Sequence, residues 1–303
     1  MEGAVRRWLV DISQWDPSPE QFSFFVSLLP KYEQSAITRF IKLDDRKRAL
    51  VSRLLQYSLV HEVLDMPYDE INIRRTIEGK PYLLQNNCRQ NIRYPNFNFN
   101  VSHSGNYVGI ASEPVCLVGL DIVSDVVFQR ESSPDFVNDF SSHFTHLEWK
   151  NIINAGSFSQ ILKEFYRYWS LKEAFVKALG IGLGFKLNRL EFHHMDWTNI
   201  SVYVDGKESR DWKFWLFDLD ERHWASIAKG HPRNATESYR CTLMRTNIED
   251  EEHCSWLALP NTQFVLRWVD ELVPHSANDI LGICGDKSRK SLNAVQCNSS
   301  SGS

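Results

Sequence analysis

Trp-Ser-Leu-Lys-Glu-Ala-Phe-Val-Lys, residues 169–177, is the stretch that decides the fold of this 303-residue chain. At helical pitch its apolar side chains gather on one face, and Glu173 and Lys177 lie one turn apart on the opposite side. The apolar face consists of Leu171, Ala174, Phe175 and Ala178. Residues 165–179 therefore predict a helix with one buried face and one charged face, ended by Gly180.

On the helix alone, the Glu173–Lys177 pair has two interpretations. An ordinary surface pair one helical turn apart adds only a few tenths of a kcal/mol to helix stability. The alternative is a functional site that uses both the carboxylate and the ammonium group. The surface pair is the simpler of the two, and two further stretches of sequence favour the site.

The first of these stretches is residues 96–103, Asn-Phe-Asn-Phe-Asn-Val-Ser-His, where apolar and polar side chains alternate strictly. The alternation predicts a half-buried strand. Its apolar face consists of Phe97, Phe99 and Val101, and its polar face of Asn98, Asn100 and Ser102. Ser-Gly-Asn at 104–106 then supplies turn residues before an apolar run at 107–111. This predicts a hairpin with Ser102 and His103 near its tip.

The second stretch, Val115 to Val123, is an almost wholly apolar strand that contains a single acid, Asp121. A lone carboxylate in such a strand costs several kcal/mol unless it is paired or bound to a cation. Asp121 is therefore expected to have a cationic partner.

Three blocks in this order resemble the signature of the phosphopantetheinyl transferases: Asn-Val-Ser-His-Ser-Gly at 100–105, Val-Gly-Leu-Asp-Ile at 118–122, and the central helix. The resemblance spans residues from about 35 to 230 and is to the large pseudo-dimeric type, above all its animal branch. It implies an α+β fold of two similar α/β halves related by a pseudo-twofold axis, with the active site at their interface. It also implies transfer of the phosphopantetheine arm of coenzyme A to a serine of an apo carrier protein, with release of adenosine 3′,5′-bisphosphate.

The resemblance also implies roles for single residues. Glu173, Lys177 and His103 would be catalytic, and Asp121 with Glu173 would bind Mg²⁺, which prefers hard oxygen ligands. Coenzyme A, the co-substrate, would contact Arg75, Gly79, Lys80, Asn100, Val101, Ser102, His103, Glu173 and Lys177. Glu173 would take the serine proton directly or through a metal-bound water, and the sequence leaves both routes open.

The chain departs from the family pattern at two positions. Ala36 stands where relatives have a basic residue that binds phosphate. Either Arg39, Arg46 or Arg48 takes this contact, or the enzyme holds that phosphate with one fewer cation. Val123 stands where many relatives have a third acid, and a water or a phosphate oxygen would fill that position.

Composition narrows the classes of protein. A hydrophobic content of 43% is typical of a globular protein, and a net charge of −4 disfavours general nucleic-acid binding. No apolar run has the length of a membrane span, and the first residues lack a signal-peptide pattern, so we expect a cytosolic monomer without membrane contact. The six cysteines are widely spread and show no Cys-x-x-Cys spacing, which disfavours structural zinc and a disulfide framework.

Along the chain we expect two halves and three further segments. These are an N-terminal half at 1–112, a C-terminal half with the metal site at 113–230, a flexible loop at 231–260, a C-terminal strand and helix turn at 261–275, and a mostly disordered tail at 276–303. Acidic carrier helices would dock on an exposed apolar and basic surface, for which a loop at 124–134 and the helix after it are the first place to look. The expected partners are apo carrier domains of fatty-acid synthase, of aminoadipate-reductase-like enzymes, and of polyketide or peptide synthases.

Two rival classes remain to be weighed. A different phosphoryl-transfer enzyme is disfavoured because the chain has no Walker motif and no kinase glycine-rich loop. A non-catalytic carrier-binding module could keep the same fold. The joint presence of His103, Asp121, Glu173 and Lys177 argues against it.

Overall fold

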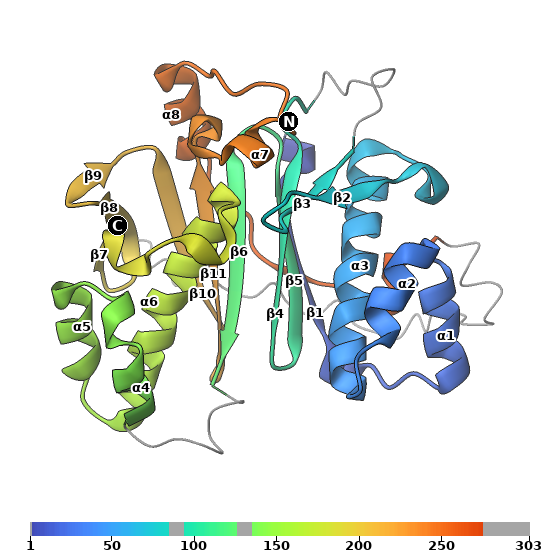
Figure 1. Ribbon diagram of the computed structural model, residues 1–303, viewed down its shortest axis with the longest axis horizontal. Coiled ribbons are helices and arrows are strands. Elements are labelled where there is room, and N and C mark those ends of the chain that lie inside the picture. The colour runs from blue at the N-terminus through green and yellow to red at the C-terminus, as the bar shows by residue number, and fades with distance from the viewer. Residues whose placement is uncertain (1, 85–93, 126–134, 275–303) are drawn as a thin grey trace.

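The computed structural model describes residues 2–84, 94–125 and 135–274 and has a mixed α+β architecture. Two main sheets lie side by side in the middle of the molecule, and a group of helices covers the outer side of each (Figure 1). The predicted α+β fold class is confirmed.

The first sheet has the strand order β12-β1-β5-β4, and the long helix α3 packs on it. Gly105, with a φ of 53°, lies in the tight turn that joins β4 to β5, so the predicted hairpin is confirmed. The elements of this part are β1 (Arg6–Asp11), α1 (Pro19–Ser27), α2 (Lys31–Thr38), α3 (Leu43–Leu64), β2 (Ile73–Arg75), β3 (Pro81–Leu83), β4 (Asn98–Ser104), β5 (Tyr107–Glu113) and β12 (Val265–Leu266).

The second sheet has the order β10-β11-β6, and α6 packs on one of its faces. Helix α6 contains the predicted central helix but begins earlier, at Phe158, after a capping box between Ser157 and Gln160. It ends as predicted at Gly180, whose φ is 77°. The elements of this part are β6 (Leu117–Ser124), α4 (Asp135–Asp139), α5 (His146–Ile153), α6 (Phe158–Leu179), β7 (Leu190–Met195), β8 (Thr198–Val204), β9 (Lys207–Ser209), β10 (Trp212–Asp220) and β11 (His223–Gly230).

The two parts repeat one order of elements. Each begins with a strand, β1 or β6, and continues with helices that end in a helix of 22 residues, α3 or α6. A small antiparallel pair follows, β2–β3 or β7–β8. Each part then forms a hairpin, β4–β5 or β10–β11, whose second strand pairs antiparallel with the opening strand. This repetition is what a pseudo-dimeric chain predicts.

Strands β4 and β6 connect the two sheets through side chains rather than through a backbone ladder. Three backbone N–H groups of β6 donate to side chains of β4: Val118 to Asn98 at 3.1 Å, Leu120 to Asn100 at 2.9 Å and Ile122 to Ser102 at 3.0 Å. The prediction that β4 is only half buried is therefore wrong, because its polar face is also buried. Its amide and hydroxyl groups satisfy the edge of β6, as buried polar groups must.

An apolar layer fills the space between the two sheets. Leu9 and Ala111 contribute from the first sheet, and Val118, Phe217 and Ile227 from the second. Separate clusters pack under α3 and under α6. The layer and the β4–β6 bonds together fix the first sheet against the second.

The segment after β11 is not the flexible loop that its polar sequence predicted. It contains helices α7 (Glu237–Arg240) and α8 (Asp250–Ala258). Tyr239, Ile248 and Leu257 are buried and anchor it to the body. So few apolar residues in a charged segment form no periodic pattern, and this packing could not be predicted from local sequence.

The strand and helix turn expected near the C-terminus are present as β12 and the 3₁₀ turn Val269–Leu272. The expected loop at 124–134 lies almost entirely outside the described residues, and the expected tail at 276–303 lies wholly outside them. Within the described ranges, no helix is both long enough and apolar enough to span a membrane.

Candidate active site

Asp121, Ser102 and Lys177 form a compact polar cluster where β4, β6 and α6 meet. The Lys177 ammonium donates to Asp121 Oδ1 at 2.6 Å and to Ser102 Oγ at 2.9 Å. Ser102 Oγ in turn lies 3.2 Å from Asp121 Oδ1. The lone acid of the apolar strand thus has the cationic partner that its burial requires.

Gly119 makes this cluster possible, because it lets α6 approach β6 very closely. A Cβ atom at this position would lie 1.9 Å from the Ala174 carbonyl oxygen and 2.7 Å from the Ala178 nitrogen. Asp121 lies two residues further along β6 and points to the same face of the strand. The close approach therefore brings Lys177, on the last turn of α6, within hydrogen-bonding distance of Asp121.

Burial raises the pKa of both acids, and the charge of Asp121 also acts on Glu173. Burial raises the pKa of Asp121, although the charge of Lys177 opposes the shift. Burial and the charge of Asp121 raise the pKa of Glu173, again opposed by Lys177. Two carboxylates with raised pKa values so near each other are a site where an added cation is stabilising.

These donors fit a magnesium ion. Asp121 and Glu173 offer hard oxygen ligands, and Mg²⁺ in proteins often binds one or two carboxylates and keeps several waters. The described residues contain no group of three or more His, Cys, Asp or Glu side chains that could hold a metal.

His103 follows Ser102 on β4 and is exposed at the rim of the cluster. Partial desolvation, together with the positive charges of Lys177, Arg48 and Arg53, lowers the pKa of His103 well below its ordinary value. The imidazole is therefore neutral at pH 7 and can donate one N–H to an anion.

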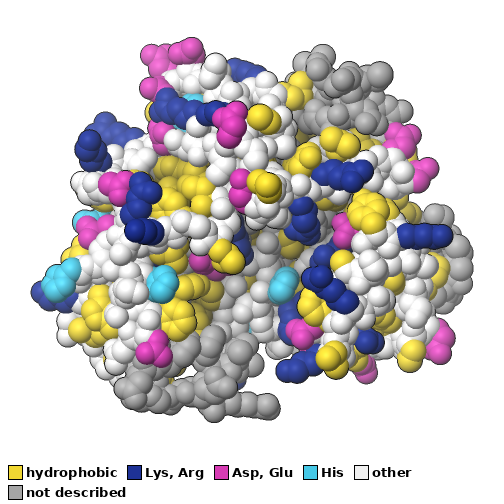
Figure 2. Space-filling model, viewed as in Figure 1, with side chains coloured by type: hydrophobic (Ala, Val, Ile, Leu, Met, Phe, Trp, Pro, Cys, Tyr) yellow, Lys and Arg dark blue, Asp and Glu magenta, His cyan; other side chains and the backbone are white. Residues whose placement is uncertain are grey.

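A pocket of about 250 Å³ adjoins this cluster and contains Lys177 in its wall. Seven of the residues expected to contact coenzyme A or phosphate line it: Arg75, Gly79, Lys80, Asn100, Val101, His103 and Lys177. They come from the β2–β3 turn, β4 and the end of α6. Figure 2 shows basic side chains gathered on this face of the molecule, over α3 and the β2–β3 hairpin. The structure thus brings together segments that are far apart in the sequence.

Arg75 and Lys80 lie in this pocket in different ways. Arg75 is exposed and donates to the Gly79 carbonyl at 3.0 Å, so most of its guanidinium can reach a ligand. The ammonium of Lys80 is buried and donates to the carbonyls of Val118, Lys177 and Ala178. Lys80 therefore caps the C-terminal end of α6 instead of presenting its charge to a nucleotide.

The pocket is also lined by three residues of α3 that had not been assigned to a site from the sequence: Ser52, Arg53 and Gln56. Arg53 belongs to the most basic stretch of the chain, and this is the only feature of the sequence that pointed to a binding role for it. It also forms an ion pair with Glu33 at 3.2 Å.

Each of the three arginines that were expected to replace the basic residue absent at position 36 has another partner. Arg46 donates to the Phe40 carbonyl, and Arg39 lies over the Phe40 ring. Arg48 donates to the Gly105 carbonyl at the hairpin tip, next to His103, and is the best placed of the three.

Comparison with known proteins agrees with this geometry. The family model for "4'-phosphopantetheinyl transferase, N-terminal" matches residues 13–115, and that for the "4'-phosphopantetheinyl transferase superfamily" matches residues 117–242. The L-aminoadipate-semialdehyde dehydrogenase-phosphopantetheinyl transferase of Rattus norvegicus is 37% identical over 251 residues, which cover 79% of this chain and 80% of the rat protein. The Homo sapiens protein of the same name is 37% identical over 240 residues, which cover 77% of this chain and 76% of the human one. A phosphopantetheinyl transferase of a Thraustochytrium species is 32% identical over 234 residues, with coverages of 75% and 79%. The chain therefore belongs to the 4'-phosphopantetheinyl transferase superfamily, the family that its three sequence blocks resemble.

Proposed function

We propose that this enzyme transfers the 4'-phosphopantetheine group of coenzyme A to a serine hydroxyl of an apo carrier protein, in an active site between its two halves. The observation that carries the proposal is the ion pair of Asp121 and Lys177 beside a basic pocket, with Glu173 near enough for its pKa to respond to both charges. This arrangement offers binding groups for both the pyrophosphate and the nucleotide of coenzyme A.

The bonds that change are simple to state. The serine oxygen attacks the phosphorus that carries the pantetheine arm, and the bond from that phosphorus to the bridging pyrophosphate oxygen breaks. Adenosine 3′,5′-bisphosphate leaves with the electron pair of that bond. Glu173 accepts the serine proton, directly or through a water, because its pKa is raised by burial and by the charge of Asp121.

Two side chains stabilise the charge that develops on the phosphate oxygens. Lys177 carries an ammonium group at the junction of the acid pair and the pocket, where it can turn from Asp121 to a phosphate oxygen. His103 is neutral and donates a hydrogen bond at the rim. Positioned donors of this kind are the main source of rate acceleration in phosphoryl transfer.

Asp121 and Glu173 would hold Mg²⁺, which when bound neutralises charge on the pyrophosphate. With the ion in place, Asp121 no longer needs Lys177 as its only counter-charge. The ammonium group is then free to bind substrate.

The pocket wall suits the nucleotide end of coenzyme A. Arg53 and Arg75 offer guanidinium groups, which bind phosphate in a bidentate manner. The backbone of the β2–β3 turn lies open beside them, since a Cβ atom on Gly79 would meet nothing within 4 Å. A planar base can therefore approach the chain closely at this turn.

The finer expectations stay proposals. They are the division of the chain into halves at residues 112 and 113, a monomeric state, a cytosolic location, and carriers that include fatty-acid-synthase, aminoadipate-reductase-like, polyketide-synthase and peptide-synthase domains. The repeated order of elements supports the division into halves, and the names of the relatives support carriers of the aminoadipate-reductase-like kind.

The direct test is to incubate the full chain with apo carrier, coenzyme A and Mg²⁺ and to weigh the carrier by mass spectrometry. We expect the carrier to gain the mass of one phosphopantetheine group. A carrier that binds the chain but gains no mass would identify a non-catalytic carrier-binding module instead.

A further inference from the structure

A second cavity, of about 270 Å³, lies at one end of the apolar layer between the two sheets. Glu113 and Lys229 each follow an apolar residue of this layer, two positions further along β5 and β11, and so point to the same faces. Residues 259–262, after α8, close the cavity on another side. Its lining residues are Val5, Glu113, Trp215, Lys229, Leu259, Pro260, Asn261 and Thr262, none of which belongs to the candidate active site.

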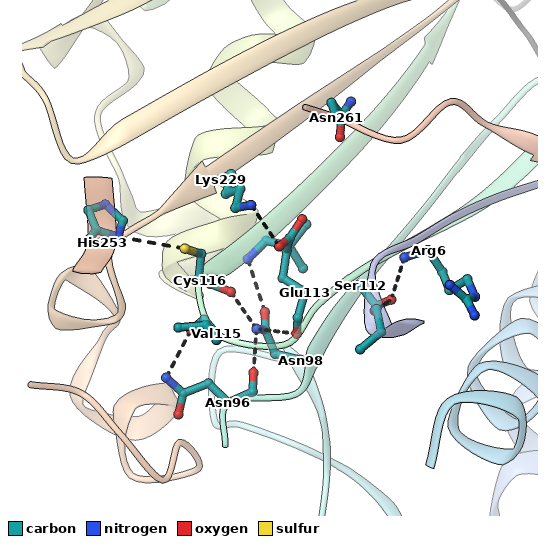
Figure 3. A network of polar contacts seen from close by, with 12 residues as sticks. Arg6, Asn96, Asn98, Ser112, Glu113, Val115, Cys116, Lys229, His253 and Asn261 are labelled. Atoms are coloured by element: carbon teal, nitrogen blue, oxygen red, sulfur yellow. Dashed lines mark hydrogen bonds and ion pairs between the residues drawn. The ribbon is translucent and has the colours of Figure 1, made fainter. Parts of the chain in front are cut away.

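The buried charges at this cavity are two positive ones and a single negative one. Glu113 forms an ion pair with Arg7 through Oε1. It forms a second one with Lys229 through Oε2, at 3.1 Å (Figure 3). The exposed fractions of Arg7, Glu113 and Lys229 are only 1%, 1% and 4%. Two cations therefore share one carboxylate in the protein interior. A buried charge without a counter-ion is costly, so the cluster favours one further negative charge.

Lys213, on the neighbouring strand β10, adds to the positive field. It lies directly across from Lys229 in the β10–β11 ladder. Burial and the charge of Lys229 lower the pKa of Lys213. The ammonium groups of Lys213 and Lys229 therefore repel each other.

The hydrogen-bond donors of the cluster are also in excess. Arg7 uses its guanidinium on Glu113, on Asn261 Oδ1 and on backbone carbonyls of Arg6 and Ser112. Lys229 has three N–H donors, and its ion-pair partner among the described residues is Glu113, whose Oε2 lies 3.1 Å away but accepts no hydrogen bond. The Asn261 Nδ2 atom is buried and has no partner in the described part of the chain. Two donor groups that need an acceptor thus border one cavity.

The remaining walls are apolar and set the shape of a suitable ligand. Val5, Trp215, Leu259 and Pro260 surround the polar end with hydrocarbon and an indole ring. Mostly apolar walls with a few converging polar groups are typical of small-molecule sites.

We propose that this cavity binds a small carboxylate with a short apolar chain. The carboxylate oxygens accept hydrogen bonds from Lys229 and Asn261, and the chain lies against Trp215. Lys229 is then shared between Glu113 and the ligand, and the surplus positive charge is neutralised. The proposal does not depend on the transferase activity, and its test does not measure that activity.

The experiment is isothermal titration of the full chain with sodium butyrate, against sodium chloride of equal ionic strength. We expect saturable binding of one butyrate per chain, with a dissociation constant in the millimolar range that so few atoms allow. A crystal structure with butyrate should show it between Lys229 and Trp215. Saturable heat with density at another place would overturn the assignment, as would the absence of any saturable heat.

Three variants make the test specific. Lys229→Met keeps the length of the side chain and leaves Glu113 paired with Arg7, so we expect a folded protein that binds butyrate about tenfold more weakly or worse. Asn261→Leu removes the second donor from a partly exposed position and should also weaken binding, which keeps the test valid if the first variant unfolds.

Lys213→Met tests the positive field alone, because Lys213 lies on the next strand and does not line the cavity, and we expect it to weaken butyrate binding less than Lys229→Met does. Unchanged affinity in Lys229→Met or in Asn261→Leu would refute the site. Displacement of butyrate by equal concentrations of inorganic phosphate would refute the preference for carboxylate.

Discussion

Replacing Gly119 with alanine tests how the candidate active site is assembled. The new Cβ atom would lie 1.9 Å from the backbone carbonyl oxygen of Ala174 and 2.7 Å from the backbone nitrogen of Ala178. Neither atom can swing aside, because both belong to the main chain of α6. An ordinary contact begins at 3.4 Å, so α6 has to withdraw from β6 by about 1.5 Å.

This withdrawal acts on the chemistry through Lys177. Its ammonium now lies 2.6 Å from Asp121 Oδ1, and a shift of this size takes the pair out of hydrogen-bonding distance. Misplacement of catalytic groups by about 1 Å can cost about 100-fold in rate. Overpacking of a core costs about 1–3 kcal/mol in stability. We therefore expect Gly119→Ala to remain folded with a somewhat lower Tm and to lose about 100-fold in kcat/KM.

The assay is the rate of carrier modification, followed by mass spectrometry, on protein shown to be folded by circular dichroism. Gly109→Ala on β5 is the matched control, since the nearest atoms to a Cβ there are side-chain ends of Ile122, Leu9 and Leu120, at 2.9, 3.3 and 3.4 Å. Those ends can move, so this variant should lose stability without a comparable loss of rate. If Gly119→Ala turns over as fast as Gly109→Ala, the close approach of α6 to β6 does not position the site.

Three more variants follow from the site. Glu173→Gln should reduce turnover by about 100-fold or more while coenzyme A still binds, because a general base is lost and the shape is kept; near-normal turnover would rule out the proposed role. Arg53→Gln should raise the KM for coenzyme A about tenfold through the loss of one charged phosphate contact, and Arg74→Gln, on an exposed residue outside the pocket, should not. Burial and the charge of Lys177 lower the pKa of Lys80 to about 7 in the folded protein. In the unfolded chain the pKa of a lysine is about 10.4, so between these two pH values the unfolded chain binds more protons than the folded one. We therefore compare the free energy of unfolding of the wild type with that of Lys80→Met by urea titration. The difference, wild type minus variant, should rise between about pH 7 and about pH 9 by at most about 2.7 kcal/mol. A difference that stays flat or falls would contradict the lowered pKa.

Local sequence patterns predicted the elements that carry the site. The spacing of apolar residues and Gly180 predicted the end and the buried face of α6. The turn residues around Gly105 predicted the β4–β5 hairpin. These features depend on interactions between near neighbours in the chain, which a single sequence records directly.

Long-range packing explains what the sequence did not predict. Alternation showed that Asn98 and Asn100 share a face but could not tell whether water or another strand covers that face. The family resemblance implied that Lys80 contacts coenzyme A, whereas its ammonium group donates to carbonyls of α6 and β6. The sequence does not distinguish Arg53 from other basic residues on helices, because its place in the pocket depends on the β2–β3 turn that lies beside it. In each case the partner is distant in sequence, so no local pattern marks it.

The account depends most on the sharing of one divalent cation by Asp121 and Glu173. The most direct measurement is a crystal structure with coenzyme A and Mn²⁺ in place of Mg²⁺, with the ion located by its anomalous scattering. We expect one Mn²⁺ whose ligands include an oxygen of each of these two carboxylates, with Lys177 turned from Asp121 toward a phosphate oxygen. A structure in which the bound ion contacts neither acid, or only one of them, would contradict the account.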